Sequence, residues 1–213
     1  MMRFLFTLIA VLVFFIRISA QTEQQSAYWT RLYAQISGSA PWEIHLEADE
    51  RKEWGTNEHL QFITHASARR HLNKKWSVAP GASYSTVTGV PEYRLFQEAH
   101  TQWPLWSKWS IQQRTRVEER WFDQPNRATL RFRFRMRHRL QLNYSPWAWG
   151  LFKLSEEYLF HTDAFDQNRV YAAFEGRFSK KIAVEMGYLY IYQQRKGSTL
   201  ESDIWRTTLI VRL

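Results

Sequence analysis

The feature that most constrains the fold is a strict alternation of side-chain types over residues 129–142. The even positions carry large apolar side chains with one exception, His138, and the odd positions carry arginine: Arg131, Arg133, Arg135, Arg137 and Arg139. A period of two places one class on each face of a β-strand, whereas a helix would mix the two classes around its circumference. The segment therefore predicts a strand with one apolar face and one strongly cationic face.

The length of this strand indicates a membrane rather than a soluble core. At about 3.3 Å per residue, residues 129–142 extend over roughly 46 Å, and a tilt of about 45° leaves a height of a little over 30 Å. That height matches the hydrocarbon core of a bilayer, which is about 30 Å thick. Strands of soluble proteins usually have only about 5–6 residues. We therefore expect a transmembrane strand.

Ten other segments repeat the alternation, five clearly and five more weakly. The clear ones are residues 42–49, 109–121, 170–178, 182–193 and 205–213, and the weaker ones are 28–36, 60–72, 76–84, 93–103 and 151–160. Together they predict an all-β chain that forms a single antiparallel transmembrane β-barrel of 10–12 strands. Because bacterial single-chain barrels have an even number of strands, we expect ten, with residues 28–36 outside the ladder, or twelve, with two strands merged in one segment.

The connections are expected to alternate in length, as short periplasmic turns and longer outer loops do in such barrels. Short connections are predicted near residues 38–41, 73–75, 104–108 and 179–181, and longer ones near 55–58, 85–92, 122–128, 161–168 and 194–203. The connection at residues 143–150 is longer than its place in this series predicts.

The N-terminus reads as an export signal. A charged start with Arg3 is followed by an apolar run over residues 4–16 and by the small residue Ala20 before a polar segment. This order of charged, apolar and small residues is typical of a secretory signal, and the run is short for a membrane anchor. We therefore expect residues 1–20 to be a cleaved signal peptide and residues 21–213 to form the barrel.

Composition supports an exported membrane protein of a Gram-negative cell. Aromatic residues make up 16% of the chain, which is expected where aromatic girdles flank the apolar band of a barrel. The chain has no cysteine, so no disulfide stabilises it. The formal net charge of +9 would suit nucleic acid, but an exported chain rarely meets any. The expected partners are therefore outer-membrane lipid and a small anionic solute, with no nucleic acid, and the barrel is expected to be a monomer.

Three sequence runs resemble a known family. RTRVEER at residues 114–120, RFRFR at 131–135 and FDQNR at 165–169 are similar to an outer-membrane β-barrel family known as domain of unknown function 2490. The resemblance extends from about residue 28 to the C-terminus. It implies a barrel in the cell outer membrane, and it implies no established activity.

The cationic face predicts a charged lumen. If the hairpin between residues 109–121 and 129–142 closes with Trp121 opposite Leu130, Glu118 faces Arg133 and three pairs of arginines face each other. Like charges directly opposite are destabilising, so other strands must supply carboxylates, for which Glu43, Glu47, Glu98, Glu157, Glu175 and Glu185 are candidates. The candidate lumen and anion-binding residues are Arg114, Arg116, Glu118, Arg120, Arg131, Arg133, Arg135, Arg137, Glu157 and Arg169.

Two functions fit such a lumen. A network of arginine and glutamate side chains can seal it, which makes the protein a structural or accessory barrel. A surplus of arginine can instead make a narrow, anion-preferring channel. A soluble secreted β-barrel that binds an acidic ligand is a further alternative, because alternation alone would also suit an antiparallel soluble sheet.

An outer-membrane lipid-modifying enzyme is the remaining alternative. His65 and Ser67 share one face of a predicted strand, as a base and a nucleophile could. Their neighbours Phe62, Ala66 and Ala68 define the opposite, apolar face, so the pair points into the lumen and away from lipid. No GxSxG motif or metal-binding motif is present. We therefore expect no enzymatic activity, no catalytic residues, no metal site and no cofactor.

Overall fold

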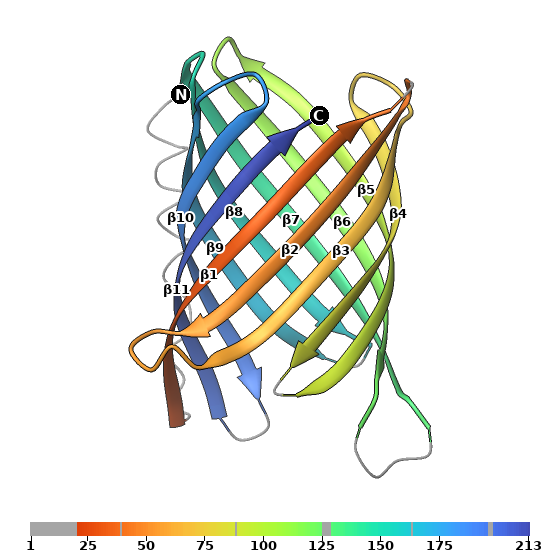
Figure 1. Cartoon of the computed structure of the whole chain (residues 1–213), viewed down its shortest axis with the longest axis vertical. Coiled ribbons are helices and arrows are strands. Elements are labelled where there is room, and N and C mark those ends of the chain that lie inside the picture. The colour runs from red at the N-terminus through yellow and green to blue at the C-terminus, as the bar shows by residue number, and fades with distance from the viewer. Residues whose placement is uncertain (1–20, 39, 88, 125–128, 163, 196–197) are drawn as a thin grey trace.

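The computed structural model describes residues 21–38, 40–87, 89–124, 129–162, 164–195 and 198–213. The expected signal peptide, residues 1–20, lies outside them. Within the described residues the chain forms eleven strands (Figure 1): β1 (Gln21–Ser37), β2 (Trp42–Glu53), β3 (His59–His71), β4 (Trp76–Val87), β5 (Val90–Trp106), β6 (Trp109–Phe122), β7 (Arg131–Trp147), β8 (Gly150–His161), β9 (Phe165–Arg177), β10 (Ile182–Arg195) and β11 (Ser198–Arg212).

The strands close into one barrel in which each strand pairs with its neighbours in sequence. The all-β fold class, a single barrel of 10–12 strands, is confirmed. The expectation of either ten or twelve strands is wrong for the described part of the chain, which has eleven. The segment 28–36 lies inside the ladder, in β1, rather than outside it.

The seam between β1 and β11 explains how an odd number of strands can close. Strands that run alternately up and down leave the first and the eleventh pointing in the same direction, so the two can pair only in parallel. The register confirms this, because Ala27 pairs with Ile204 and Tyr33 with Ile210 in a parallel ladder, whereas the other ten neighbouring pairs are antiparallel.

The two ends of the barrel differ in their connections. The end with the links β1–β2, β3–β4, β5–β6, β7–β8 and β9–β10, called here the turn end, also holds the chain's last residue (Figure 1). The opposite end, called here the loop end, includes the longest connection, residues 123–130 between β6 and β7. Residues 143–150 break no alternation, because β7 continues to Trp147 and β8 begins at Gly150. Several predicted outer loops, including residues 194–203, are mostly strand.

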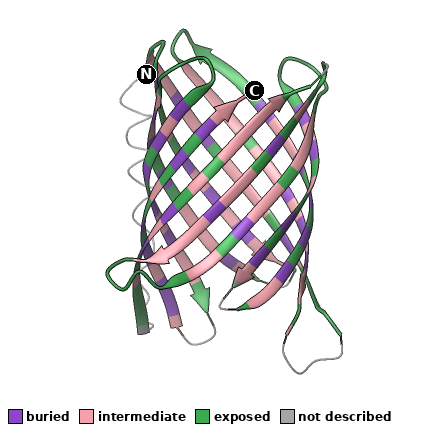
Figure 2. Ribbon diagram, in the orientation of Figure 1, coloured by how far each residue is buried: buried purple, intermediate pink, exposed green. Residues whose placement is uncertain are grey.

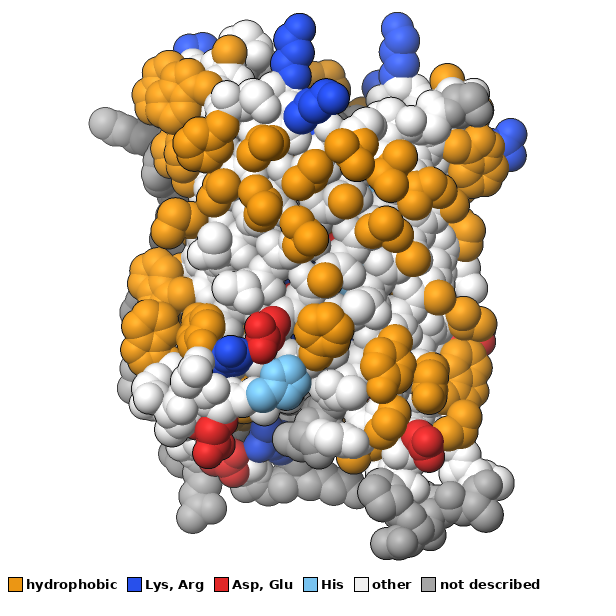
Figure 3. Space-filling view, in the orientation of Figure 1, with side chains coloured by type: hydrophobic (Ala, Val, Ile, Leu, Met, Phe, Trp, Pro, Cys, Tyr) orange, Lys and Arg blue, Asp and Glu red, His pale blue; other side chains and the backbone are white. Residues whose placement is uncertain are grey.

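The barrel turns its apolar side chains outward and its charged ones inward (Figures 2 and 3). Large apolar side chains such as Leu46, Phe132 and Met186 are exposed on the outside, while Glu92, Glu118 and Glu175 are buried. Aromatic side chains gather near both ends of the strands. Those near the turn end include Trp42, Trp76, Trp103, Trp147 and Trp149, and those nearer the loop end include Trp54, Phe62, Tyr84, Tyr93, Trp121 and Phe132.

No helix among the described residues is long and apolar enough to cross a membrane.

The close packing around Gly187, a glycine that faces the lumen, leads to a prediction about stability. A Cβ atom added at Gly187 would lie 2.6 Å from the Tyr171 hydroxyl oxygen and 2.7 Å from both the Ala172 carbonyl oxygen and the Ala173 Cβ. Because close-packed surroundings resist added volume, Gly187→Ala is expected to lower the free energy of unfolding by about 1–3 kcal/mol. Urea unfolding in detergent micelles, followed by tryptophan fluorescence, measures this change.

Gly176 provides a matched control on the neighbouring strand β9. A Cβ atom there would meet its nearest neighbour, in the Phe174 ring, at 3.6 Å, which is an ordinary contact. Gly176→Ala should therefore leave the unfolding midpoint almost unchanged. Equal midpoints for the two variants would show that the space around Gly187 is not as tight as these distances indicate.

Candidate anion site in the barrel lumen

A cavity of about 1180 Å³ occupies the lumen. The alternation of the strands directs charged side chains into this cavity. In β7 to β10 the odd-numbered residues point inward, and in β5, β6 and most of β11 the even-numbered residues do. Among the described residues, fourteen arginines and three carboxylates line the cavity. The arginines are Arg31, Arg51, Arg94, Arg114, Arg116, Arg120, Arg131, Arg133, Arg135, Arg137, Arg139, Arg169, Arg195 and Arg206, and the carboxylates are Glu47, Glu157 and Asp166.

The structure brings the predicted lumen residues together around this cavity. Nine of the ten line it directly: Arg114, Arg116, Arg120, Arg131, Arg133, Arg135, Arg137, Glu157 and Arg169. The tenth, Glu118, has no exposed surface and lies behind the arginines that contact it.

The register predicted for the β6–β7 hairpin is wrong by two residues. Trp121 pairs with Phe132 rather than Leu130, because β6 ends at Phe122 and β7 begins at Arg131, one residue later than the predicted pairing requires. Glu118 therefore lies opposite Arg135 and not Arg133. Opposed arginines do occur, with shifted partners: Arg120 faces Arg133, Arg116 faces Arg137 and Arg114 faces Arg139.

Glu118 is the carboxylate that these opposed arginines share. Its oxygens lie 2.5 Å from Arg135, 3.2 Å from Arg137 and 3.5 Å from Arg116. Glu157 on β8 is also shared by two arginines, since its oxygens lie 2.5 Å from Arg114 and 2.7 Å from Arg137. Such charge-assisted, hydrogen-bonded contacts offset the repulsion between adjacent guanidinium groups.

Strand β5 supplies two more carboxylates to the same wall. Glu92 accepts hydrogen bonds from Arg94 and Arg120, each at 2.5 Å at the closest. Glu98 accepts a hydrogen bond from Arg116 and lies 3.5 Å from Arg114. Glu98 thus belongs to a network of arginine and glutamate side chains that links strands β5 to β8, while Glu92, Arg94 and Arg120 form a separate cluster on β5 and β6.

A second network links strands β8 to β11. Lys153 contacts Glu175 at 2.7 Å and Glu185 at 2.6 Å, and Arg206 contacts Glu185 at 2.9 Å. The sequence indicated Glu175 and Glu185 as possible anions but not their partners Lys153 and Arg206. Both basic residues could have been found from the inward phase of their strands, since each alternates with outward-facing apolar neighbours.

Three of the arginines that line the cavity have no carboxylate partner in the described part of the chain. Within the described part of the chain, Arg131, Arg133 and Arg139 form no ion pair within 4.0 Å, and all three belong to β7. Arg131 and Arg133 are exposed and lie toward the loop end, where β7 begins, while Arg139 is deeper. These side chains are available to an anion that enters from the loop end.

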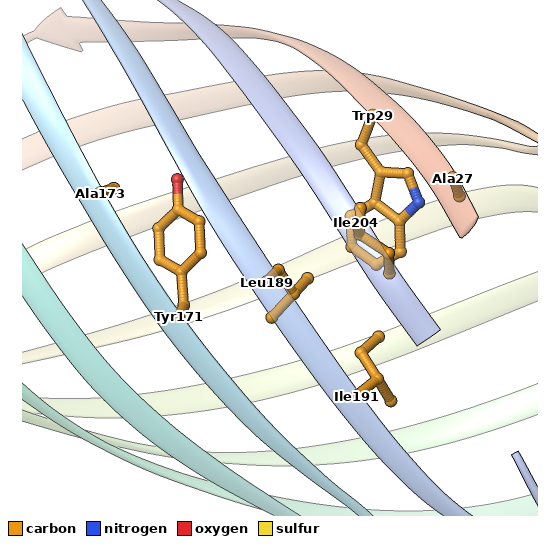
Figure 4. Close-up of a cluster of buried hydrophobic side chains, with 7 residues drawn as sticks. All are labelled: Ala27, Trp29, Tyr171, Ala173, Leu189, Ile191 and Ile204. Carbon is orange, nitrogen blue, oxygen red and sulfur yellow. The ribbon is translucent and has the colours of Figure 1, made fainter. Parts of the chain in front are cut away.

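The wall across from β7 contains apolar side chains (Figure 4). Trp29, Leu189, Ile191 and Ile204 from β1, β10 and β11 pack into one buried cluster that also includes Tyr171 of β9. These five residues line the same cavity as the arginines. The lumen therefore has unpaired arginines on β7 and an apolar wall on β1 and β9 to β11, and the arginines that line the cavity from those four strands are ion-paired.

His65 and His138 lie on different faces of the barrel. His65 lines the lumen and packs edge-on against Phe96, and no hydrogen bond to Ser67 occurs among the described residues. On the outer face, His138 accepts or donates a hydrogen bond with Thr115 at 3.0 Å, and Gln113 lies 3.3 Å from its other ring nitrogen. These bonds satisfy a polar side chain that interrupts an apolar face, about halfway along β7.

A closed barrel that is antiparallel except at the β1–β11 seam, with a charged lumen and an apolar exterior, is a porin-like β-barrel. A family model matches residues 26–201, and the chain belongs to that family, which is described as "Protein of unknown function (DUF2490)".

Among solved structures, a NanC porin in a rhombohedral crystal form has a similar fold. The TM-score is 0.53 and the sequence identity is 12%, and the match covers 82% of this chain and 88% of that one. At this identity the likeness concerns the fold alone. No curated protein matches the chain.

Proposed function

We propose that this protein is a monomeric outer-membrane barrel of a Gram-negative cell that admits small anionic solutes into an arginine-lined lumen. The membrane location is supported by the outward apolar faces and by aromatic side chains near both ends of the strands. The N-terminal sequence, with its charged, apolar and small residues in order, fits export by a cleaved signal peptide at residues 1–20. A soluble barrel would keep its arginines in water and its apolar faces inside.

The imbalance of charge in the cavity is the observation that carries the anion preference. Among the described residues, fourteen arginines and three carboxylates line it. Five more buried carboxylates pair with these arginines from behind the cavity surface, and the arginines still outnumber the carboxylates when these are counted: Asp49, Glu92, Glu98, Glu118 and Glu185. A low-dielectric wall with one sign of charge focuses the field and concentrates counter-ions. Anions should therefore enter more readily than cations.

A sealed barrel is the second candidate, and the ion-pair networks favour it. Glu118, Glu175 and Glu185 are buried among basic side chains, and toward the turn end the inward-facing residues Gln141, Asn143 and Lys153 do not line the cavity. In that case the lumen is a pocket that opens only at the loop end, and the barrel has a structural or accessory role.

Conductance across a planar bilayer separates the two candidates. The refolded protein is added to a bilayer in a salt gradient, and the reversal potential reports ion selectivity. Steady, small, anion-selective openings are expected if the lumen conducts. A silent bilayer, with heat-modifiable electrophoretic migration showing that the barrel is folded, would support the sealed pocket. Cation-selective openings would contradict the anion preference itself.

A further inference from the structure

An apolar wall is unexpected in the lumen of a membrane barrel, where the interior is ordinarily polar. Here Trp29, Leu189, Ile191 and Ile204 project inward from β1, β10 and β11 (Figure 4). The partly buried Leu60 of β3 packs against them. All five line the arginine-bearing cavity. A solute that enters this cavity meets apolar side chains as well as charge.

The part of the apolar wall on the seam strands faces β7 across the lumen. In the closed order of strands, β7 is separated from β1 by four strands on one side and five on the other, so it lies opposite the seam. The arginines without carboxylates are on β7, and Trp29 and Ile204 are on the seam strands β1 and β11. Arg131 and Arg133 lie toward the loop end, as do Ile191 and Ile204 on their own strands.

Two arginines also stack on aromatic rings of the apolar wall. The Arg51 guanidinium lies 3.7 Å from the centre of the Trp29 ring, and the Arg206 guanidinium lies 3.8 Å from that of Tyr171. Stacking of this kind holds a guanidinium flat on an aromatic face while its N–H groups point along its own plane.

We propose that the preferred solute is an amphipathic organic acid, with one carboxylate joined to an apolar body. The carboxylate binds an unpaired arginine of β7, and the body packs against the cluster around Ile204. A fully polar anion would satisfy the arginines and leave the apolar wall in contact with water. A neutral apolar molecule would leave the arginines without a partner. This inference rests on the proposed function and adds the chemical class of the solute.

The probe is 3-phenylpropionate, titrated by calorimetry into the full barrel in lipid nanodiscs, with empty nanodiscs as the blank for partition into lipid. Propionate supplies the same charge without the ring, and 3-phenylpropionamide supplies the ring without the charge. Because each buried methylene contributes about fourfold in affinity, 3-phenylpropionate is expected to bind at least about tenfold more tightly than either.

Two isoleucines of β11 provide a matched pair of variants. Both are buried and face the lumen, but Ile204 lines the cavity and Ile210 does not. Ile204→Thr is expected to weaken 3-phenylpropionate binding at least about fourfold and to leave propionate binding unchanged, while Ile210→Thr changes neither. Leu200→Thr, at another residue that lines the cavity, replaces Ile204→Thr if that variant does not refold.

The outcomes separate this inference from the proposed function. Equal affinities for 3-phenylpropionate and propionate would overturn the inference and leave an anion-binding lumen. Equal loss of binding in Ile204→Thr and Ile210→Thr would also overturn it, because the effect would then come from altered packing. Failure of every carboxylate to bind would overturn the proposed function as well.

Discussion

Replacing Glu118 with glutamine is expected to lower the free energy of unfolding of the barrel by about 3–5 kcal/mol. The change removes one charge and almost no volume. It leaves Arg116, Arg135 and Arg137, which lie 2.5–3.5 Å from the carboxylate, without the anion that they share. Removing one partner of a buried ion pair is costly because the remaining charges stay buried and uncompensated. Urea unfolding in detergent micelles, followed by tryptophan fluorescence, measures the loss.

Two control variants test whether this loss comes from the ion pairs. Glu119 is the next residue of β6 and faces the outside, and it has no ion pair among the described residues, so Glu119→Gln should be almost neutral. Arg133→Leu should also change stability little, because Arg133 has no carboxylate partner in the described residues. The register expected from the sequence, with Arg133 opposite Glu118, instead predicts that Arg133→Leu destabilises the barrel. Equal destabilisation by Glu118→Gln and Arg133→Leu would mean that Glu118 lies opposite Arg133 after all.

The strands were predictable because one physical rule governs them. A segment that faces lipid on one side and a charged lumen on the other must alternate, so residues 129–142 indicated both the strand and its two faces. The same rule places Arg114, Arg116 and Glu118 in the lumen. Alternation is insensitive to a shift of two residues, however, since every side chain keeps its face. The register of the β6–β7 hairpin depended on where the turn ends, and the alternation does not determine that.

The closure of the barrel and the apolar wall were not predictable in the same way. Alternation identifies strands but not which strand pairs with the last one, so the parallel seam of β1 and β11 has no local signal. The apolar wall contradicts the rule that was used, because Trp29, Ile191 and Ile204 stand at inward positions where a polar residue is expected. On each strand, an inward-facing apolar residue is an isolated exception to the alternation. These residues come together in one cluster only when the barrel closes.

Replacing Arg131, Arg133 and Arg139 together with glutamine is expected to reduce the anion preference of the lumen at least about tenfold. A unit charge about 4 Å from an anion contributes about 1 kcal/mol in water, so Arg131 and Arg133, which are two residues apart on one face of β7, contribute up to roughly 2 kcal/mol to one anion before screening by salt. Arg139 acts on an anion deeper in the lumen. None of the three forms an ion pair within the described part of the chain, so the triple variant should unfold at an unchanged urea concentration.

The measurements are the reversal potential in a salt gradient and the affinity for inorganic phosphate by calorimetry, so that an open and a sealed barrel both give a readout. The corresponding triple lysine variant keeps the charges and should keep both values. The Glu118→Gln variant is expected to lose stability and retain the anion preference, which is the reverse pattern. If the glutamine triple variant retained its selectivity and phosphate affinity, the paired arginines, and not the unpaired ones of β7, would attract the anion.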